Sequence, residues 1–473
     1  MNKQNETPLF DQLKRHDQKD SLSFHVPGHK FGKVFAEKGI GPFENILKLD
    51  ATEISGLDDL HGAEGVILHA KQLLSDYYGS KSSYFLVNGS TSGNIAAIMA
   101  SVRPGEKVLV QRNSHKSVLH GIELAGAEPV FVMPEHEEAT GRYSKITKEM
   151  IHKALKAHPE IKAIVLTYPD YFGRTYQIQE IIEYSHVQKV PVIVDEAHGV
   201  HFKLGDPFPL SSVDLKADIV IQSAHKMAPA MTMASFLHVQ TERVDLSRLE
   251  YCLQMLQSSS PSYPIMASLD LARYFLAAFT EEQKRELLEF IDEVRSGLAH
   301  SPLFELLPLT ERDDPLKITL IPHPSLSGFE LAEQLENAGL FPEMATADQV
   351  LFTLGLTPHI NIEDLEKRLE TLNCQLKIQP AHDTIKRKNL SIPALQTLEV
   401  NYQDMQYKTP VFVPWKEAAG RICAKAIIPY PPGIPLVLKG ERVTKEHHEQ
   451  ILSLQQEKAS FQNKDIELGM WVF

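Results

Sequence analysis

Between residues 84 and 239 the chain alternates short apolar runs with amphipathic segments, and no other feature restricts its fold as strongly. The runs are rich in β-branched residues and apolar on both faces, as expected of strands covered on both sides of a parallel sheet. Strand and helix repeated in this way predict a doubly wound α/β domain, whose ligands gather at the carboxyl ends of the strands. The apolar runs are residues 84–87, 107–110, 129–133, 163–168, 191–195, 218–222 and 235–239, and the clearest amphipathic segments are 148–160 and 178–189.

After a helical region around residues 265–298, strand-like and helix-like segments alternate again over a shorter stretch of the chain. Two further strands and two further helices are predicted there, one helix starting at the N-cap Ser327 and ending at Gly339. The strands are residues 316–323 and 349–355, and the helices are residues 327–339 and 361–372. This pattern predicts a compact α+β domain.

The length of 473 residues exceeds what one hydrophobic core organises, so more than one domain is expected. We predict an N-terminal arm with the large domain, then a small α+β domain, then a linker with a C-terminal domain. The three parts are residues 1–300, 301–375 and 376–473.

The charge balance excludes some partners. The chain has 48 Lys and Arg against 61 Asp and Glu, a net charge of −13, which disfavours nucleic acids and anionic membranes as partners. The first residues lack the apolar core of a signal peptide, and no apolar run approaches the length of a membrane span. The three cysteines match no metal-binding or redox spacing. We therefore expect a cytoplasmic protein without a metal site.

The segment VNGSTSGN, residues 87–94, joins the first apolar run to a helix. Its glycines permit close approach of the backbone, and the hydroxyls of Ser90, Thr91 and Ser92 stand beside the free amides of a helix N-terminus. Such a place binds phosphate. The alternative is an ordinary N-cap, because neither of the common nucleotide-binding glycine motifs is present.

The segment PVIVDEAHGVHF, residues 191–202, places Asp195 at the end of the most apolar run. A carboxylate there needs a cationic or hydrogen-bonding partner. One alternative is the N-cap of a following helix. Another is a metal site that uses Asp195, Glu196, His198 and His201, although their spacing does not put them on one helical face.

The segment QSAHKMAPA, residues 222–230, places Lys226 between an apolar run and a loop of small residues. An ammonium group there loses its water and needs a chemical task or a partner. A phosphate cradle, an aspartate at one strand end and a lysine at another fit pyridoxal 5′-phosphate (PLP). Lys226 would form the Schiff base, and Asp195 would pair with the protonated pyridine nitrogen.

With these motifs the sequence resembles the ornithine/lysine/arginine decarboxylases of PLP fold type I, in the shorter bacterial form without an N-terminal wing domain. The resemblance extends over nearly the whole chain, and GLDDLH and PYPPGIP are its most distinctive parts. It is carried by FHVPGHK (24–30), TEISGLDDLHGAEGVI (52–67), NGSTSGN (88–94), RNSHKS (112–117), DEAHG (195–199), SAHK (223–226), SSSPSYPIMASLD (258–270) and PYPPGIP (429–435). The fold that it implies is the aspartate aminotransferase fold, with a mostly parallel sheet in the large domain.

The resemblance also implies individual roles around the cofactor. His115 would stack on the cofactor ring, and His198 would lie near its phenolic oxygen. Proton return to Cα is left open between His225 and Lys226. The residues that would hold the phosphate are Thr91, Ser92, Ser223 and His225.

The side chain of a basic substrate requires an acidic contact, for which Asp58, Asp59 and Glu441 are candidates. For the two aspartates the alternative is a turn or a helix cap, and for Glu441 it is a solvated loop. Lys425 stands where many relatives carry an acidic residue, which weakens any transfer of substrate identity.

The function that follows is PLP-dependent decarboxylation of arginine, lysine or ornithine, giving the amine and CO₂. Two alternatives remain open: another PLP reaction, namely transamination or aldol cleavage, and a non-catalytic relative that carries the cofactor. The resemblance further implies at least a homodimer, in which residues 258–264 reach the partner's cofactor.

Overall fold

The computed structural model describes residues 3–18, 22–375, 393–429, 435–456 and 459–473. The chain divides into two compact units. Unit 1 contains residues 1–101, 165–168 and 182–280, and unit 2 contains residues 102–164, 169–181 and 281–473. Strand β6 (Ile161–Thr167) and helix α7 (Ile178–Val187) cross this division. Within the described ranges no helix combines the length and the apolarity that crossing a membrane requires.

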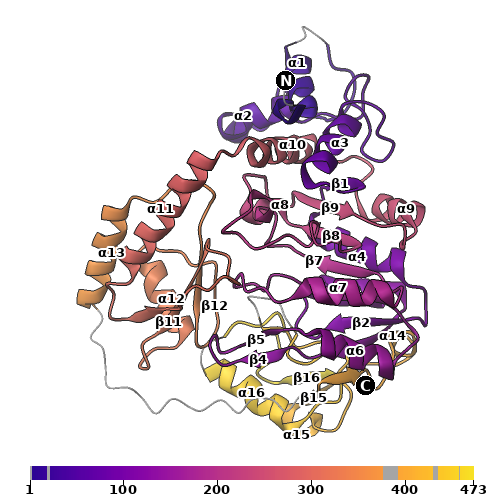
Figure 1. Cartoon of the computed structure of the whole chain (residues 1–473), viewed down its shortest axis with the longest axis vertical. Helices are drawn as coiled ribbons and strands as arrows, with labels where there is room; N and C mark the ends of the chain where they lie inside the picture. Colours follow the sequence, from indigo (N-terminus) through magenta and orange to yellow (C-terminus); the bar gives the residue numbers. More distant parts are fainter. Residues whose placement is uncertain (1–2, 19–21, 376–392, 430–434, 457–458) are drawn as a thin grey trace. The chain divides into compact units, whose positions relative to one another are not determined.

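The sheet of unit 1 has the strand order β1-β9-β8-β7 (Figure 1). Strands β7 and β8 are parallel, whereas β9 is antiparallel to both of its neighbours. We expected residues 235–239 to be one more parallel strand, and this prediction is wrong. The connection from β8 to β9 holds only the four-residue helix α8 (Ala224–Met227), too little for the crossover that parallel neighbours need. The bounds are β1 Ser82–Leu86, β7 Val192–Asp195, β8 Ile219–Gln222 and β9 Ser235–Val239.

Helix α4 (Gly89–Ser101) packs against one face of this sheet (Figure 1). The approach is close at Gly93, where a Cβ atom would lie 2.6 Å from Leu86 Cδ1 and 3.1 Å from Ile221 Cγ2. Only glycine fits there without displacing a buried side chain. This contact also defines which face each strand residue occupies, because Leu86 and Ile221 point toward α4.

The remaining helices of unit 1 contact the sheet or one another. Helix α3 contacts β1, and α1 contacts α3 and α10. The buried carboxylate of Asp270 in α10 accepts hydrogen bonds from the backbone amides of Leu9 and Phe10, which fixes the start of α1. The bounds are α1 Pro8–Asp17, α2 Ile40–Leu49, α3 Val66–Tyr78, α9 Leu246–Leu256 and α10 Tyr263–Ala278.

The sheet of unit 2 joins β2 (Lys107–Gln111), β3 (Glu128–Val132) and β14 (Leu395–Thr397). The first two are parallel, and β14 is antiparallel to β3. Helices α5 (Lys116–Ala125) and α6 (Lys148–Ala157) belong to this region. The predicted runs therefore became strands, but β14 and the hairpin β4–β5 were not predicted, because their residues are mostly polar. The hairpin strands are Glu135–Glu137 and Arg142–Lys145.

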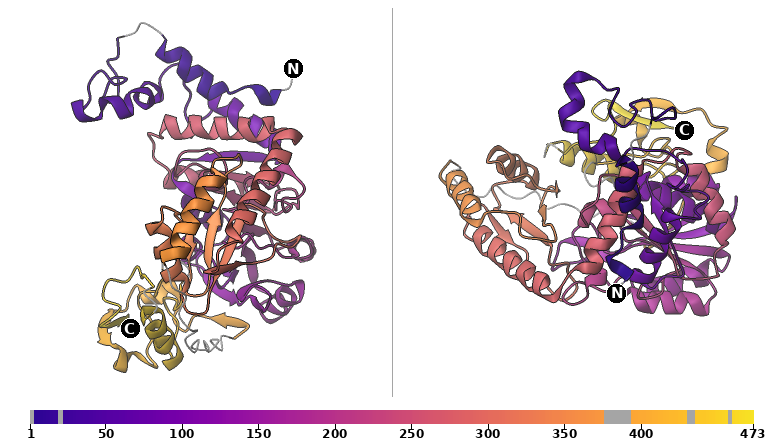
Figure 2. Two further views of the ribbon diagram at one scale, coloured as in Figure 1. Left: turned by 90° about the vertical axis from the view of Figure 1, so that its left-hand side faces the viewer. Right: turned by 90° about the horizontal axis from the view of Figure 1, so that it is seen from above.

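A small antiparallel sheet follows, with the strand order β10-β11-β13-β12. Helices α11 and α13 lie side by side next to it (Figures 1 and 2). The predicted start of α12 is confirmed, because Ser327 and Glu330 form a reciprocal capping box. The bounds are β10 Phe304–Leu306, β11 Lys317–Pro322, β12 Met344–Ala345, β13 Val350–Thr353, α11 Glu281–Leu298, α12 Gly328–Asn337 and α13 Ile362–Gln375.

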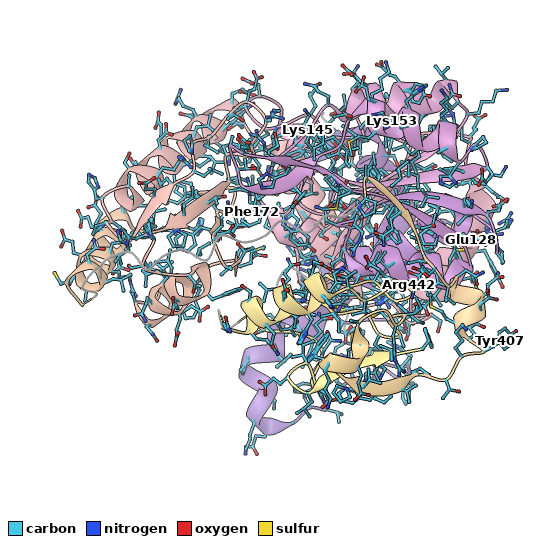
Figure 3. All side chains as sticks on the ribbon, turned by 90° about the horizontal axis from the view of Figure 1, so that it is seen from below. Glu128, Lys145, Lys153, Phe172, Tyr407 and Arg442 are labelled. Atoms are coloured by element: carbon cyan, nitrogen blue, oxygen red, sulfur yellow. The ribbon has the colours of Figure 1, made fainter. Side chains whose placement is uncertain are left out.

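The C-terminal segment forms its own hydrophobic core around strands β15 and β16. Figure 3 shows this segment with its side chains, among them Tyr407 and Arg442. Most of the motif PYPPGIP lies outside the described residues, as do residues 376–392 of the predicted polar linker. The three-domain division stays a prediction. The bounds are β15 Val411–Pro414, β16 Gly469–Val472, α14 Tyr402–Met405, α15 Trp415–Ala418 and α16 Lys445–Gln456.

Candidate active site

Asp195 is the last residue of β7, and its side chain is 4% exposed. Its Oδ2 accepts a hydrogen bond of 2.9 Å from Asn94 Nδ2 of α4. Its Oδ1 is buried and has no hydrogen-bond partner among the residues that the structure describes. Burial raises the pKa of Asp195, while the charge of Lys226 and hydrogen bonds from Asn94 and the Ala197 amide oppose the rise. A buried carboxylate oxygen with unused acceptor capacity is costly unless a donor from a ligand meets it.

Lys226 lies in α8, the short helix that follows β8. Its Nζ is 3.1 Å from Nε2 of His198, which is 4% exposed and belongs to the loop after β7. Nδ1 of His225 lies 2.9 Å from the backbone carbonyl of Ala234, so this nitrogen carries the proton in that hydrogen bond. The ends of β7 and β8 therefore bring an aspartate, a histidine and a lysine into one region of unit 1.

The predicted phosphate residues lie at the start of α4 and at the end of β8. The hydroxyls of Ser90 and Ser223 are 2.7 Å apart, and Ser90 also donates to Ser235 at 3.2 Å. Ser92 is buried and donates to the carbonyl of Gly89, whereas Thr91 is exposed. Ser90 and Ser223 thus come together, while Ser92 satisfies the first turn of its own helix.

His115 belongs to unit 2, where it is the N-cap of α5. Its Nδ1 accepts a hydrogen bond from the Ser117 amide and lies 2.9 Å from the Ser117 hydroxyl. This contact orients the imidazole ring. The predicted stacking of His115 on a cofactor ring stays a prediction.

The carboxylate of Asp58 accepts hydrogen bonds from several backbone amides at the start of α3. The donors are the amides of Asp59, Glu64, Gly65, Ile67 and Leu68, at 2.8 to 3.3 Å. Partial burial acts to raise the pKa of Asp58, but the hydrogen bonds from the amides of Glu64, Asp59, Gly65 and Leu68 lower it below its ordinary value. Asp59 accepts from the His61 amide at 3.0 Å. The contacts of Asp58 are those of the helix-cap alternative and the contact of Asp59 is that of the turn alternative, and a role in substrate binding stays a prediction for both aspartates.

Glu441, the third acidic candidate, lies in unit 2 and is 4% exposed, so it is not in a solvated loop. Its Oε2 is 3.0 Å from Arg112 Nη2 and accepts from the Leu438 amide at 2.7 Å, and its Oε1 accepts from Gln396 at 2.9 Å. Arg112 also donates to the carbonyls of Pro435 and Leu436. Both oxygens of Glu441 thus have partners within the protein. Lys425, which the resemblance led us to expect as a departure from the family pattern, places its Nζ 4.3 Å from the centre of the Trp471 ring.

Glu196, a member of the alternative metal set, turns away from Asp195. Its carboxylate is fully buried and accepts hydrogen bonds from Ser211, Ser212 and Gln222. In the described part of the chain no group of three or more His, Cys, Asp or Glu residues has the geometry to hold a metal ion.

The sequence reading missed two polar residues in this region, Asn94 and Gln222. Asn94 lies in α4 and Gln222 at the end of the apolar strand β8, and both are buried. A buried amide needs partners, and this requirement was the available signal. In the structure the partners are the carboxylates of Asp195 and Glu196.

The fold, with an aspartate and a lysine at neighbouring strand ends and a hydroxyl-bearing helix start, is that of PLP enzymes of fold type I. Residues 7–313 match the model of the Orn/Lys/Arg decarboxylase major domain, and residues 386–464 match that of the C-terminal domain. The chain belongs to the Orn/Lys/Arg decarboxylase family, whose members are PLP-dependent decarboxylases of basic amino acids.

Individual relatives support this assignment along nearly the full length. The chain is 43% identical to the uncharacterized protein YaaO of Bacillus subtilis over 93% of this chain and 92% of the relative. It is 33% identical to an arginine decarboxylase of the same organism, covering 94% and 92%. Among solved structures, the lysine decarboxylase LdcF of Francisella novicida shares the fold with a TM-score of 0.82 at 21% identity, covering 99% of this chain and 81% of that one.

Proposed function

We propose that the protein binds PLP at the ends of β7 and β8 and decarboxylates arginine to the corresponding amine. The observation that carries the proposal is the buried Oδ1 of Asp195, which has no hydrogen-bond partner within the described ranges. A protonated pyridine nitrogen is a cationic donor and would satisfy this acceptor. PLP fits the residues present, because Oδ1 of Asp195 lies in the same region of unit 1 as the Lys226 amine.

Each proposed cofactor residue has a distinct task. Lys226 would hold the cofactor aldehyde covalently, and Asp195 would keep the ring nitrogen protonated. His198 would lie beside the phenolic oxygen, and His115 would stack on the ring. The phosphate would be held by Ser90, Thr91, Ser92, Ser223 and His225. When bound, PLP supplies an electron sink for the electron pair that remains at Cα when CO₂ leaves.

The chain's own groups would then control protons. Nε2 of His198 lies 3.1 Å from Lys226 Nζ, so His198 can accept a proton from the ammonium group and keep the amine nucleophilic. Proton return to Cα would come from Lys226 Nζ or from His225. Because Nδ1 of His225 donates to the Ala234 carbonyl, a proton delivered by His225 would come from Nε2.

Arginine is the first candidate substrate because of the comparison of relatives. The arginine decarboxylase of Bacillus subtilis is 33% identical over nearly the whole chain, whereas the lysine decarboxylase LdcF is 21% identical, a level that supports the fold alone. Lysine and ornithine remain the alternatives within the family.

The decisive experiment is a panel assay of the purified protein with carboxyl-labelled arginine, lysine and ornithine, with Lys226→Ala as the blank. We expect release of labelled CO₂ with arginine at the highest kcat/KM and no release by the blank. A keto acid in place of CO₂ would identify transamination. Cofactor absorbance that no amino acid perturbs would identify a non-catalytic relative, and either result would overturn the proposal.

We also propose that the active form is at least a homodimer. The N-terminal segment of unit 1 exposes several large apolar side chains, as an association surface does. Light scattering combined with the activity assay tests this, and a fully active monomer would contradict it. The exposed side chains are Leu22, Phe24, Val26, Val34 and Phe43, at 81%, 91%, 65%, 62% and 49% exposure.

A further inference from the structure

A fully buried carboxylate, Glu196, follows Asp195 directly in the sequence and is used by none of the steps above. Its Oε1 accepts from the Ser211 hydroxyl and from Gln222 Nε2, both at 2.7 Å. Its Oε2 accepts from the Ser212 amide at 2.5 Å and from the Ser212 hydroxyl. Four donors thus converge on one carboxylate, two on each oxygen.

The hydrogen bonds continue from Gln222 across the sheet. Oε1 of Gln222 is 3.1 Å from Nε2 of His238 in β9, and Nδ1 of His238 is 2.8 Å from the Ser83 hydroxyl in β1. Burial lowers the pKa of His238 to about 3, so its ring is neutral. With Gln222 donating to Glu196, His238 must carry its proton on Nε2 and accept from Ser83 on Nδ1. The chain from Ser83 to Glu196 therefore has a single direction of donation.

This polar chain lies on the face of the sheet opposite to α4. Ile221 points toward α4, so its neighbour Gln222 points to the other face. His238 pairs with Val220, which shares the face of Gln222, and Ser83 pairs with His238. Asp195 faces α4 through Asn94. The carboxylate of Glu196 thus lies at the ends of β7 and β8 on one face of the sheet, and the candidate site lies at the same strand ends on the opposite face.

We propose that Glu196 is a positioning residue, which holds the loop after β7 against the end of β8 and so sets the placement of Asp195, His198 and Lys226 for PLP. This inference rests on the proposed function. The backbone agrees with it, since the Glu196 amide donates to the Ile221 carbonyl at 2.8 Å. The loop also closes tightly over Glu196, because a Cβ atom on Gly199 would lie 2.6 Å from Glu196 Cγ. Supporting contacts of this kind orient the groups that touch a ligand.

The geometry requires a carboxylate and is not compatible with an amide of the same shape. Each oxygen of Glu196 receives one N–H donor that cannot become an acceptor, namely the Gln222 amide group and the Ser212 backbone. In Glu196→Gln, the new NH₂ group would face one of these two donors whichever way it turned. Gln222 could turn over only if His238 moved its proton to Nδ1 and donated to the Ser83 hydroxyl, which would reverse every hydrogen bond of the chain. The variant therefore keeps the volume of Glu196 but either loses one of its donors or reverses the chain.

The test compares Glu196→Gln with Ser83→Ala, which cuts the same chain at its far end. The readout is the Kd of pyridoxamine 5′-phosphate for the full-length apoprotein, because this probe lacks the aldehyde and reports the non-covalent fit. We expect Glu196→Gln to weaken the probe's binding by about tenfold to a hundredfold, as supporting contacts do in other sites. We expect Ser83→Ala to lower the melting temperature while leaving the Kd within about twofold of wild type.

Equal Kd values for Glu196→Gln and wild type would overturn the proposal, as would equal weakening in both variants. If Glu196→Gln does not fold, Ser211→Ala removes a single donor and should still weaken the probe several-fold, and an unchanged Kd there would overturn the proposal. A wild-type protein that binds neither the probe nor PLP would instead overturn the proposed function, so the two failures are distinguishable.

Discussion

The buried carboxylates of Asp195 and Glu441 differ in the number of hydrogen-bond and ion-pair partners that the fold gives them. Asp195 in unit 1 and Glu441 in unit 2 are each 4% exposed. Glu441 has an arginine, a backbone amide and a glutamine around its two oxygens. Asp195 receives hydrogen bonds from Asn94, on Oδ2, and from the Ala197 amide, while its Oδ1 has no partner in the described part of the chain. The two side chains are equally buried, but only the carboxylate of Glu441 is saturated, that is, has partners on both of its oxygens.

We expect this difference to separate structural from functional acidic residues better than burial or sequence position does. A saturated buried ion pair stabilises the place where it lies, and removing one partner leaves the other charge unpaired. An unsaturated buried carboxylate destabilises the protein until a ligand completes it, and such groups are candidates for functional sites. On this criterion Glu441 anchors the C-terminal segment to Arg112, and Asp195 is the acid that we propose to meet a cationic donor of the cofactor.

The largest effect is expected for Asp195→Asn. The amide keeps the shape and can still bond Asn94, but it cannot hold a protonated ring nitrogen, so kcat for CO₂ release should fall about a hundredfold to a thousandfold. The melting temperature of the apoprotein should stay the same or rise, because the variant removes an unsatisfied buried charge. Steady-state kinetics and thermal melting of the same preparations check both parts.

The matched control for this variant is Asp214→Asn. Asp214 pairs with Lys203 at 2.5 Å and is 34% exposed, so its charge already has a partner at the surface. The kcat of the Asp214→Asn variant should equal that of wild type. If Asp195→Asn retained full activity, the oxygen of Asp195 without a partner would have no role in catalysis. The lack of a partner would then not distinguish a functional acid from a structural one.

An intermediate effect is expected for Glu441→Gln, and it should appear in stability. Arg112 would keep its burial and lose its anionic partner, which should cost about 3 kcal/mol of unfolding free energy. The kcat and KM for arginine of the folded protein should change by less than about threefold, since the change is only in anchoring. Chemical unfolding and steady-state kinetics separate these outcomes.

The contrasting pair for this variant is Arg442–Glu399, whose side chains are 50% and 44% exposed. Glu399→Gln should lower stability far less than Glu441→Gln, because water screens the exposed pair. A tenfold rise in KM for Glu441→Gln with unchanged stability would instead make Glu441 a substrate contact, as the sequence alone allowed.

The strands were predictable from the sequence because their signal is local. Runs such as 191–195 and 218–222 have apolar centres, residues 192–194 and 219–221, and they became β7 and β8. The direction of β9 was not predictable in this way, because it depends on how much chain lies between two strands and not on the pattern within either. The polar hairpin β4–β5 and the strand β14 have too few apolar residues for the pattern to detect.

The residues that could carry the chemistry of the candidate site were predictable from the sequence, but the hydrogen-bond partners of its acidic residues were not. Asp195 and Lys226 stand out because charged residues at the ends of apolar runs are unusual. Whether an acid is saturated depends on partners distant in the sequence, such as Arg112 for Glu441, which are 329 positions apart. The support by Glu196 was hidden for the same reason, although Gln222 and His238 are visible as polar residues within predicted strands.

The smallest effect is expected for Asp58→Asn, which extends the comparison to a third acid. Asp58 resembles Glu441 in saturation, since five backbone amides donate to its carboxylate, and its φ of 70° is one that asparagine also adopts readily. The variant should lower stability by about 1 kcal/mol at neutral pH, as loss of a helix cap does. Because the folded-state pKa of Asp58 lies below its ordinary value of 3.8, the stabilisation is present above that pH and is lost as the pH falls through the folded-state pKa. The melting temperatures of wild type and variant should therefore converge as the pH falls below 3.8. An Asp58→Asn protein with unchanged melting and a much higher KM for arginine would show that saturation by backbone amides does not mark an acid as structural.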